Sequence, residues 1–436
     1  MKSSMTRRGF FGRTAAAGVG GAALLASMNS QASAADGEPI IVGCPSPLTG
    51  IVAADGIEFR RGLELAAEEI NTIGGILGRP IQLEFVDTES KGDDVVSQAA
   101  QRLVDRNNAS ALITGYNLET GTVLPEISAD AGVICMHAQT QVTHEEVIKS
   151  DPDRYWGSFM IDPPETFYAD GLLEFIKELE TKGKFDRPND KLAIITGPGN
   201  YSVNIADTLN EKAKEYGFEV SLFETVKVPI SEWGPTLSKL RADPPAVIAM
   251  THYFPQDQAQ FMLQFMDDPT DSLVYMQYGA SLAAFRDVAG DASEGVLYAT
   301  VIGALQDEIG IAFREAYAAK FGADASPNSG GQTYQALYMY AIAASLAGGV
   351  GAAYEEEQNR KVAERLRGLI FRGPMGTYRC VQETQSAYAY PAQTNDPSLG
   401  MPHIFSQIQS KAEDGKLVAP WPYIVADFQL PNWMKS

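Results

Sequence analysis

Five short polar stretches carry the side chains best suited to chemistry, and each follows directly on an apolar run. They are YNLETGT at 116–122, HAQTQVTHE at 137–145, PGNYS at 198–202, THYFPQD at 251–257 and QYGAS at 277–281. Phenol, amide and hydroxyl groups dominate these stretches, and such groups hold small molecules through hydrogen bonds. The pattern favours recognition of a small polar solute.

The sequence lacks the motifs that indicate catalysis, a metal or a nucleotide. Cys135, His137 and His144 lie close together, but Cys-x-His with a histidine seven residues further on fits no common zinc spacing. The stretch GPGNYS from Gly197 lacks the third glycine of a dinucleotide loop. There is no serine elbow, no His-Glu-x-x-His and no phosphate-binding Gly-Lys-Ser/Thr loop. We therefore expect no enzymatic activity, no cofactor and no metal.

The polar stretches recur at one position in an alternation of strands and helices. The apolar runs are PIIVGC, IQLEFVD, ASALITG and GVICMH in a first array, and KLAIITG, FEVSLFETV, AVIAMTHY and SLVYMQYG in a second. Helical periods between them predict an α/β fold with parallel sheets covered on both faces. Ligands bind outside the carboxyl ends of strands in such sheets, so we expect the polar stretches to share a cleft.

Residues 56–87 show how one strand is positioned. Apolar residues recur at intervals of three and four from Gly56 to Asn71, which predicts a helix. Gly74 and Gly75 end that helix, because glycine adopts positive φ at little cost, and a strand is expected over 81–87. Residues 308–370 predict nearly continuous helix, followed by a tail rich in Gly, Pro and Tyr.

The first 34 residues have the layout of a twin-arginine export signal. Arg7 and Arg8 precede an apolar stretch of small residues, and cleavage is expected after Ala34. Loss of the four basic residues in this segment lowers the formal net charge from −21 to −25. That charge argues against binding to nucleic acid or to anionic membranes, which depends on clusters of Lys and Arg.

Length and cysteine content predict the number of domains and the state of the thiols. About 400 mature residues exceed what one core usually supports, so roughly two domains are expected. The longest later apolar run, YMYAIAASLAGGVGAAY, is interrupted by glycines and is too short to span a bilayer comfortably. Cys44, Cys135 and Cys380 are expected to be free, with a single disulfide as the alternative in an oxidising compartment.

Three segments resemble the type I periplasmic binding proteins of ABC transporters, in the branch for branched-chain amino acids, amides and urea. They are IIVGCPSPLTG, GLELAAEEINTIGGILGRPIQLEFVDTES and AGDASEGVLYAT. The resemblance implies two α/β lobes joined by several crossovers, which close over a solute by hinge motion. It places lobe 1 at 39–159 and 303–371, and lobe 2 at 160–302 and 372–436. It also implies a periplasmic protein, acting as a monomer with a permease and an ATPase.

The resemblance also assigns candidate ligand-binding residues. They are Tyr116, Asn117, Glu119, Gln139 and Thr140 in lobe 1, and Tyr201, Tyr253, Gln277 and Tyr278 in lobe 2. Family members that hold an α-amino acid usually present a lobe 2 carboxylate to its ammonium, whereas this chain has Gln277 and Tyr278 at that place. Glu119 or Asp257 could supply the charge from another direction.

The absence of this carboxylate leaves more than one class of solute to consider. A neutral amide or urea needs only hydrogen bonds, so an amide-like solute is slightly favoured over a hydrophobic amino acid. A quaternary ammonium held in a cage of tyrosines is a third hypothesis. A sensor subunit that reports a similar solute to a signalling partner is the alternative to transport.

Overall fold

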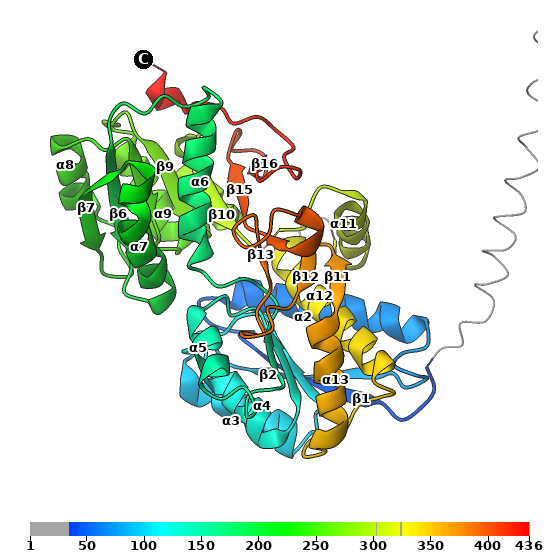
Figure 1. Ribbon diagram of the computed structural model, residues 1–436. Helices are drawn as coiled ribbons and strands as arrows, with labels where there is room; N and C mark the ends of the chain where they lie inside the picture. Colours follow the sequence, from blue (N-terminus) through cyan, green and yellow to red (C-terminus); the bar gives the residue numbers. More distant parts are fainter. Residues whose placement is uncertain (1–34, 302, 323–324, 436) are drawn as a thin grey trace, which may run out of the picture.

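The computed structural model describes residues 35–301, 303–322 and 325–435, which form two lobes (Figure 1). A cavity lies between the lobes. The expected export signal, residues 1–34, lies outside the described residues. Strands and helices alternate from Ile40 to Thr300, which confirms the predicted α/β class. No helix in the described ranges is long and apolar enough to cross a membrane.

The first lobe is built on a five-stranded parallel sheet with the order β2-β1-β3-β4-β5. Its strands are β1 (Ile40–Ser46), β2 (Ile81–Asp87), β3 (Ala111–Ile113), β4 (Ile134–His137) and β5 (Ser158–Met160). The helices between them are α2 (Ala53–Thr72), α3 (Asp93–Asp105), α4 (Val123–Ala131) and α5 (Val142–Ser150). Ile113 packs in a cluster with Leu63 of α2, whereas Leu112 packs in another with Leu103 of α3. Both faces are therefore covered.

The predicted turn before β2 is present. Helix α2 ends at Thr72, and Gly74, Gly75 and Gly78 all have positive φ. A side chain at Gly75 would place Cβ only 2.1 Å from the carbonyl oxygen of Arg79, so both space and backbone conformation require glycine.

The second lobe contains a seven-stranded sheet with the order β16-β15-β10-β9-β8-β6-β7. Strands β6 (Lys191–Thr196), β7 (Glu219–Thr225), β8 (Val247–Met250), β9 (Leu273–Gln277) and β10 (Leu297–Thr300) run parallel. The helices of this lobe are α6 (Phe167–Thr181), α7 (Asn200–Lys212), α8 (Gly234–Ala242), α9 (Pro255–Phe265) and α10 (Ala283–Ala289). Strands β15 (Ile404–Gln407) and β16 (Lys416–Ala419) add an antiparallel edge that the sequence did not predict.

The stretch expected as nearly continuous helix is three helices. They are α11 (Glu308–Phe321), α12 (Pro327–Leu346) and α13 (Glu356–Gly368). Pro327 begins α12, and Gly348 and Gly349 follow its end with positive φ. Helix α12 lies along α2 so closely that a Cβ on Gly62 would lie 2.0 Å from the carbonyl oxygen of Gly330.

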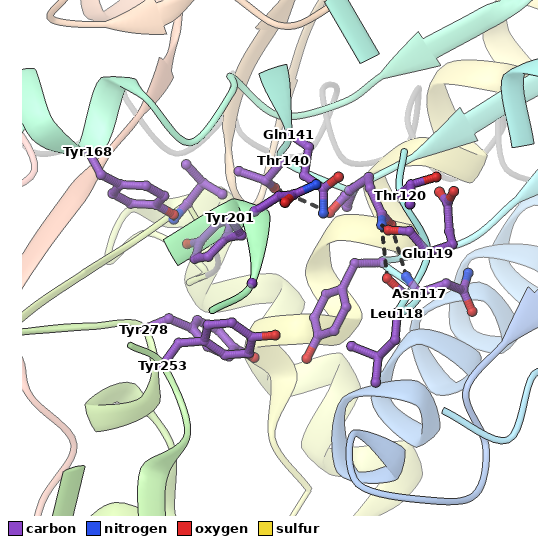
Figure 2. A pocket seen from close by; sticks show the side chains of 16 residues that line it. Asn117, Leu118, Glu119, Thr120, Thr140, Gln141, Tyr168, Tyr201, Tyr253 and Tyr278 are labelled. Carbon is purple, nitrogen blue, oxygen red and sulfur yellow. Dashed lines mark hydrogen bonds between the residues drawn. The ribbon is translucent and has the colours of Figure 1, made fainter. Parts of the chain in front are cut away.

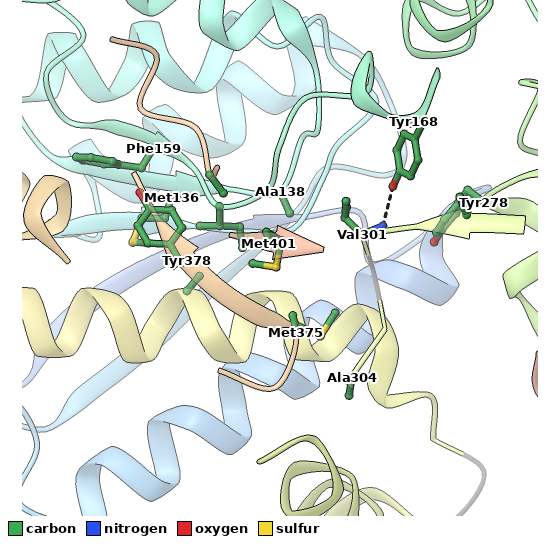
Figure 3. Packing of buried hydrophobic residues seen from close by; sticks show 14 of the residues in the cluster. Met136, Ala138, Phe159, Tyr168, Tyr278, Val301, Ala304, Met375, Tyr378 and Met401 are labelled. Atoms are coloured by element: carbon green, nitrogen blue, oxygen red, sulfur yellow. Dashed lines mark hydrogen bonds between the residues drawn. The ribbon is translucent and has the colours of Figure 1, made fainter. Parts of the chain in front are cut away.

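The chain crosses from one lobe to the other after β5, after β10 and again after the β11–β12 hairpin (Ile370–Gly373 and Gly376–Arg379). The short strands β13 (Ala389–Tyr390) and β14 (Met401–Pro402) pair on the last passage. A continuous apolar cluster accompanies these crossings. Figure 3 shows Met136 and Phe159 of lobe 1 in this cluster together with Tyr378, Met401 and Val301.

All three cysteines are buried and unpaired, which confirms the expectation of free thiols. Burial raises the pKa of each thiol, that of Cys380 to about 11.

Candidate functional site

A cavity of about 280 Å³ lies between the lobes, where the carboxyl-end loops of both sheets meet (Figure 2). Lobe 1 contributes residues 116–120 after β3 and 138–141 after β4. Lobe 2 contributes Tyr168, residues 199–201, Tyr253, Tyr278 and Val301. Eight of the nine predicted residues line this cavity, and Gln277 does not.

Phenols dominate the lining. Tyr116, Tyr168, Tyr201, Tyr253 and Tyr278 all face the cavity, and the described lining contains no Lys, Arg or His. The rings of Tyr201 and Tyr253 meet edge to face with centroids 5.5 Å apart. A surface of this kind offers apolar ring faces together with a few hydrogen-bonding groups, as small-molecule sites typically do.

Asp55, which sequence reasoning missed, organises two of these phenols. The hydroxyls of Tyr116 and Tyr278 donate to Asp55 Oδ2 at 2.5 and 2.8 Å, and Ser329 Oγ donates to Oδ1 at 2.6 Å. Asp55 is buried in the first turn of α2, where the helix dipole favours an acid. That helical position was the one sequence signal for it, and it did not distinguish Asp55 from an ordinary surface acid.

Gln139 shapes the loop after β3. Its Oε1 accepts from the backbone N–H of Asn117 at 2.9 Å, and its Nε2 donates to the carbonyls of Asn117 and Glu119 at 2.9 and 3.0 Å. The Asn117 side chain accepts from Thr88 Oγ1 at 2.7 Å and donates to the Pro45 carbonyl at 3.2 Å. Both amides therefore hold the loops that carry the site, and their polar atoms are engaged by protein.

His137 and His144 support the same loop. The N–H of Gln139 donates to His137 Nδ1 at 3.3 Å, and His137 Nε2 lies 3.0 Å from His144 Nδ1. Burial lowers the pKa of both rings, that of His144 to about 4. His137 and His144 are thus both neutral and form a hydrogen-bonded pair that contacts Gln139. No group of three potential metal ligands occurs among the described residues.

Glu119 is a lining residue whose carboxylate turns back to the start of α4. Its Oε2 accepts from the backbone N–H groups of Gly121 and Val123 at 2.8 and 3.2 Å. Burial raises the pKa of Glu119 to about 7, although these two hydrogen bonds lower it. Asp257, the other candidate for a charge in the site, accepts from His252 Nε2 at 2.9 Å and from the N–H of Ile230 at 3.0 Å, and lies outside the lining.

Gln277 acts on the site through Tyr201. Its Nε2 donates to Tyr201 Oη at 2.7 Å, and its Oε1 accepts from the Tyr275 hydroxyl. Tyr168, another lining residue that sequence reasoning missed, accepts at its Oη from the N–H of Val301 at 2.7 Å, as Figure 3 shows. Tyr168 belongs to α6, just after a crossover and not in a loop that follows a strand, so its place in the sequence did not indicate a cavity residue.

Two buried acids lie at the first crossover. Glu165 accepts from the N–H of Val142 at the start of α5 and from Asn204 Nδ2 of α7, both at 2.7 Å, so it joins the lobes. Asp162 accepts from Thr140 Oγ1 at 3.2 Å and from Gln332 Nε2 at 2.6 Å. Burial raises the pKa of Glu165 and of Asp162 to about 7.

Comparison with known proteins decides the family. A family model described as periplasmic binding protein matches residues 39–395. The chain belongs to this family. Its members bind solutes and are not enzymes, and the two-lobed architecture agrees with that membership.

Relatives with known structures and names support the assignment. A crystal structure of a putative branched-chain amino acid ABC transporter from Silicibacter pomeroyi is 67% identical, with a TM-score of 0.89 over 91% of this chain and 100% of that one. The leucine-, isoleucine-, valine-, threonine- and alanine-binding protein of Pseudomonas aeruginosa is 25% identical over 81% of this chain and 88% of its own length. Streptococcus pneumoniae LivJ in complex with isoleucine shares the fold, with a TM-score of 0.68 at 17% identity over 88% of this chain and all of that one.

Proposed function

We propose that this chain is the substrate-binding component of an ABC importer. It captures a small polar organic solute, either an amide- or urea-like compound or a hydrophobic amino acid, in the cleft between its lobes. The observation that carries this proposal is the cavity of about 280 Å³, lined from both lobes by phenol, hydroxyl and amide groups. A cavity that needs both lobes to enclose it favours a guest that stabilises the closed form.

Two sets of observations support the two solute classes. The described lining has no lobe 2 carboxylate, because Gln277 and Tyr278 stand where amino-acid-binding members of the family usually present one, and Asp257 is engaged elsewhere. A neutral amide needs no such charge. The names of the relatives from Pseudomonas aeruginosa and Silicibacter pomeroyi favour an amino acid instead.

The division into lobes at 39–159 with 303–371 and 160–302 with 372–436 belongs to this proposal. It is supported by the sheets, since β1–β5 lie in one and β6–β10, β15 and β16 lie in the other. Delivery to a membrane permease and its ATPase, a periplasmic location and a monomeric state complete the proposal.

A thermal-shift screen tests the function directly. Amino acids, short amides and urea are offered to the purified mature chain, and calorimetry follows on every compound that raises the melting temperature. Binding stabilises the folded protein by mass action, so a solute at 100 times its Kd adds about 2.7 kcal/mol. Small-angle scattering should then show contraction with the solute. A chain that binds no compound, retains no guest in native mass spectrometry and keeps one shape would contradict the proposal.

A further inference from the structure

The hydroxyl protons of Tyr116 and Tyr278 are both engaged in hydrogen bonds to Asp55. A phenol carries one proton and two acceptor lone pairs, whereas a carboxylate only accepts. Both hydroxyls lie within hydrogen-bond distance of Asp55 Oδ2, and Ser329 takes Oδ1. Because their protons are engaged by Asp55, the lining residues Tyr116 and Tyr278 can only accept hydrogen bonds from a guest at this end of the site.

Tyr168 and Tyr201 differ, because their phenol oxygens accept hydrogen bonds from the protein. The N–H of Val301 donates to Tyr168 Oη, and Gln277 Nε2 donates to Tyr201 Oη, both at 2.7 Å. Because each oxygen already accepts, the phenolic protons remain to be donated. Tyr168 also accepts from the Tyr201 hydroxyl, so the Tyr201 proton can be shared with Tyr168 while the Tyr168 proton remains for a guest.

We propose that this polarity defines the solute class: a guest with an N–H group for the Asp55 end and a carbonyl or carboxylate oxygen for the Tyr168 and Tyr201 end. The inference rests on the proposed function and deepens it. Asp55 is then a specificity-determining residue that never touches the guest. It acts by orienting the hydroxyls of Tyr116 and Tyr278.

The geometry also makes the acceptor end depend on closure. Asp55, Ser329 and Tyr116 belong to elements of the first lobe, and Tyr278 follows β9 of the second. Both acceptor oxygens are oriented together only when the lobes meet. A guest that offers only acceptors at this end would leave buried lone pairs facing one another, which is costly.

Matched solutes test the assignment in the wild-type chain. Valeramide is compared with 2-hexanone, in which a methyl group replaces the amide NH₂, and leucine is compared with 4-methyl-2-oxopentanoate. By calorimetry, the N–H-bearing member of any pair that binds should bind about 10-fold to 100-fold more tightly. Equal affinity within a pair that binds would overturn the inference and leave the proposed function intact.

Variants separate polarity from general damage. Asp55→Asn can donate from its amide and so release the phenolic protons, and it should reduce the discrimination ratio towards one. Tyr278→Phe removes an acceptor without altering the carboxylate and should lower the same ratio. Asp105→Asn is the control, since Asp105 accepts from the Tyr354 hydroxyl at 2.6 Å on an exposed surface far from the cavity. A merely structural role would weaken both members of a pair equally.

The released guest gives an independent measurement. Protein purified under native conditions is denatured, and any retained solute is identified by mass spectrometry. A guest with an N–H donor supports the inference, and a guest without one overturns it. A chain that retains no guest and binds neither probe pair would remove the proposed function together with the inference.

Discussion

Tyr278 Oη lies 2.8 Å from Asp55 Oδ2, and this hydrogen bond joins residues 223 positions apart that belong to different lobes. Tyr278 has a φ of +51°, a backbone conformation uncommon for a residue with a side chain. The contact between the lobes therefore stabilises a tyrosine in an uncommon conformation through a buried carboxylate. Orientation of this cavity phenol depends on the two lobes being in contact.

Tyr278→Phe should consequently weaken closure as well as binding. Hydrogen bonds to charged groups contribute about 1.5–3 kcal/mol, so solute affinity should fall by that amount. Small-angle scattering of the solute-free variant should show a larger radius of gyration than the wild type. An unchanged affinity and an unchanged radius would exclude the interlobe role.

The Gln277–Tyr201 pair should behave as one unit. Tyr201→Ala is expected to weaken solute binding by roughly 1–3 kcal/mol, because the phenol is a cavity contact. Gln277→Leu should have a smaller effect, since it acts only by holding the Tyr201 hydroxyl at 2.7 Å. In a double-mutant cycle the two effects should be clearly non-additive, measured by calorimetry. Additive losses would mean that Gln277 contacts the solute independently.

Glu165 should make stability depend on pH. Its folded pKa of about 7 lies above the value of about 4.3 for an unfolded chain, so its contribution is complete below that lower value and is lost as pH rises through 7. Glu165→Gln has no proton to lose. The free energy of unfolding of the variant, relative to that of the wild type, should therefore increase by up to about 3 kcal/mol from pH 4.5 to pH 8.

Urea unfolding at several pH values measures this difference. The buried histidines His137 and His144 titrate in both proteins and cancel in the comparison. Glu68→Gln, a change at a carboxylate whose side chain is 66% exposed, is the control for loss of one surface charge. A Glu165→Gln profile parallel to that of the wild type would contradict the prediction.

Gly62→Ala should destabilise the lobe that carries Asp55 and Ser329. The added methyl would lie 2.0 Å from the Gly330 carbonyl and 2.6 Å from Thr333 Oγ1, so α2 and α12 must move apart. Overpacking of this kind typically costs about 1–3 kcal/mol. Gly368→Ala, at the end of α13 with nothing within 4 Å, should be neutral or slightly stabilising. Thermal unfolding of both variants would measure the contrast.

The sequence predicted the site to the extent that strand ends determine it. Tyr116, Gln139, Tyr201 and Tyr253 were found because each follows an apolar run, and a parallel sheet places such positions at one edge. Asp55 was missed because its partners come from distant parts of the chain. No local pattern indicates that a first-turn acid will be buried beneath phenols.

The differences between expectation and structure have similar physical causes. Gln277 stands at the end of β9 as predicted, but its side chain points to Tyr201 and Tyr275 and lies outside the lining. The edge strands β15 and β16 were missed because four-residue strands in a tail rich in turn residues give too little periodicity. Register and direction of single side chains are decided by tertiary packing.

The state of the cysteines determines how lobe motion can be followed. Cys44, Cys135 and Cys380 are buried with raised pKa values, so maleimide reagents should leave the native thiols unmodified. One surface cysteine introduced on each lobe would then accept a fluorophore without removal of any native residue. The distance between two such dyes, recorded on single molecules, would report opening and closing on an otherwise unaltered chain.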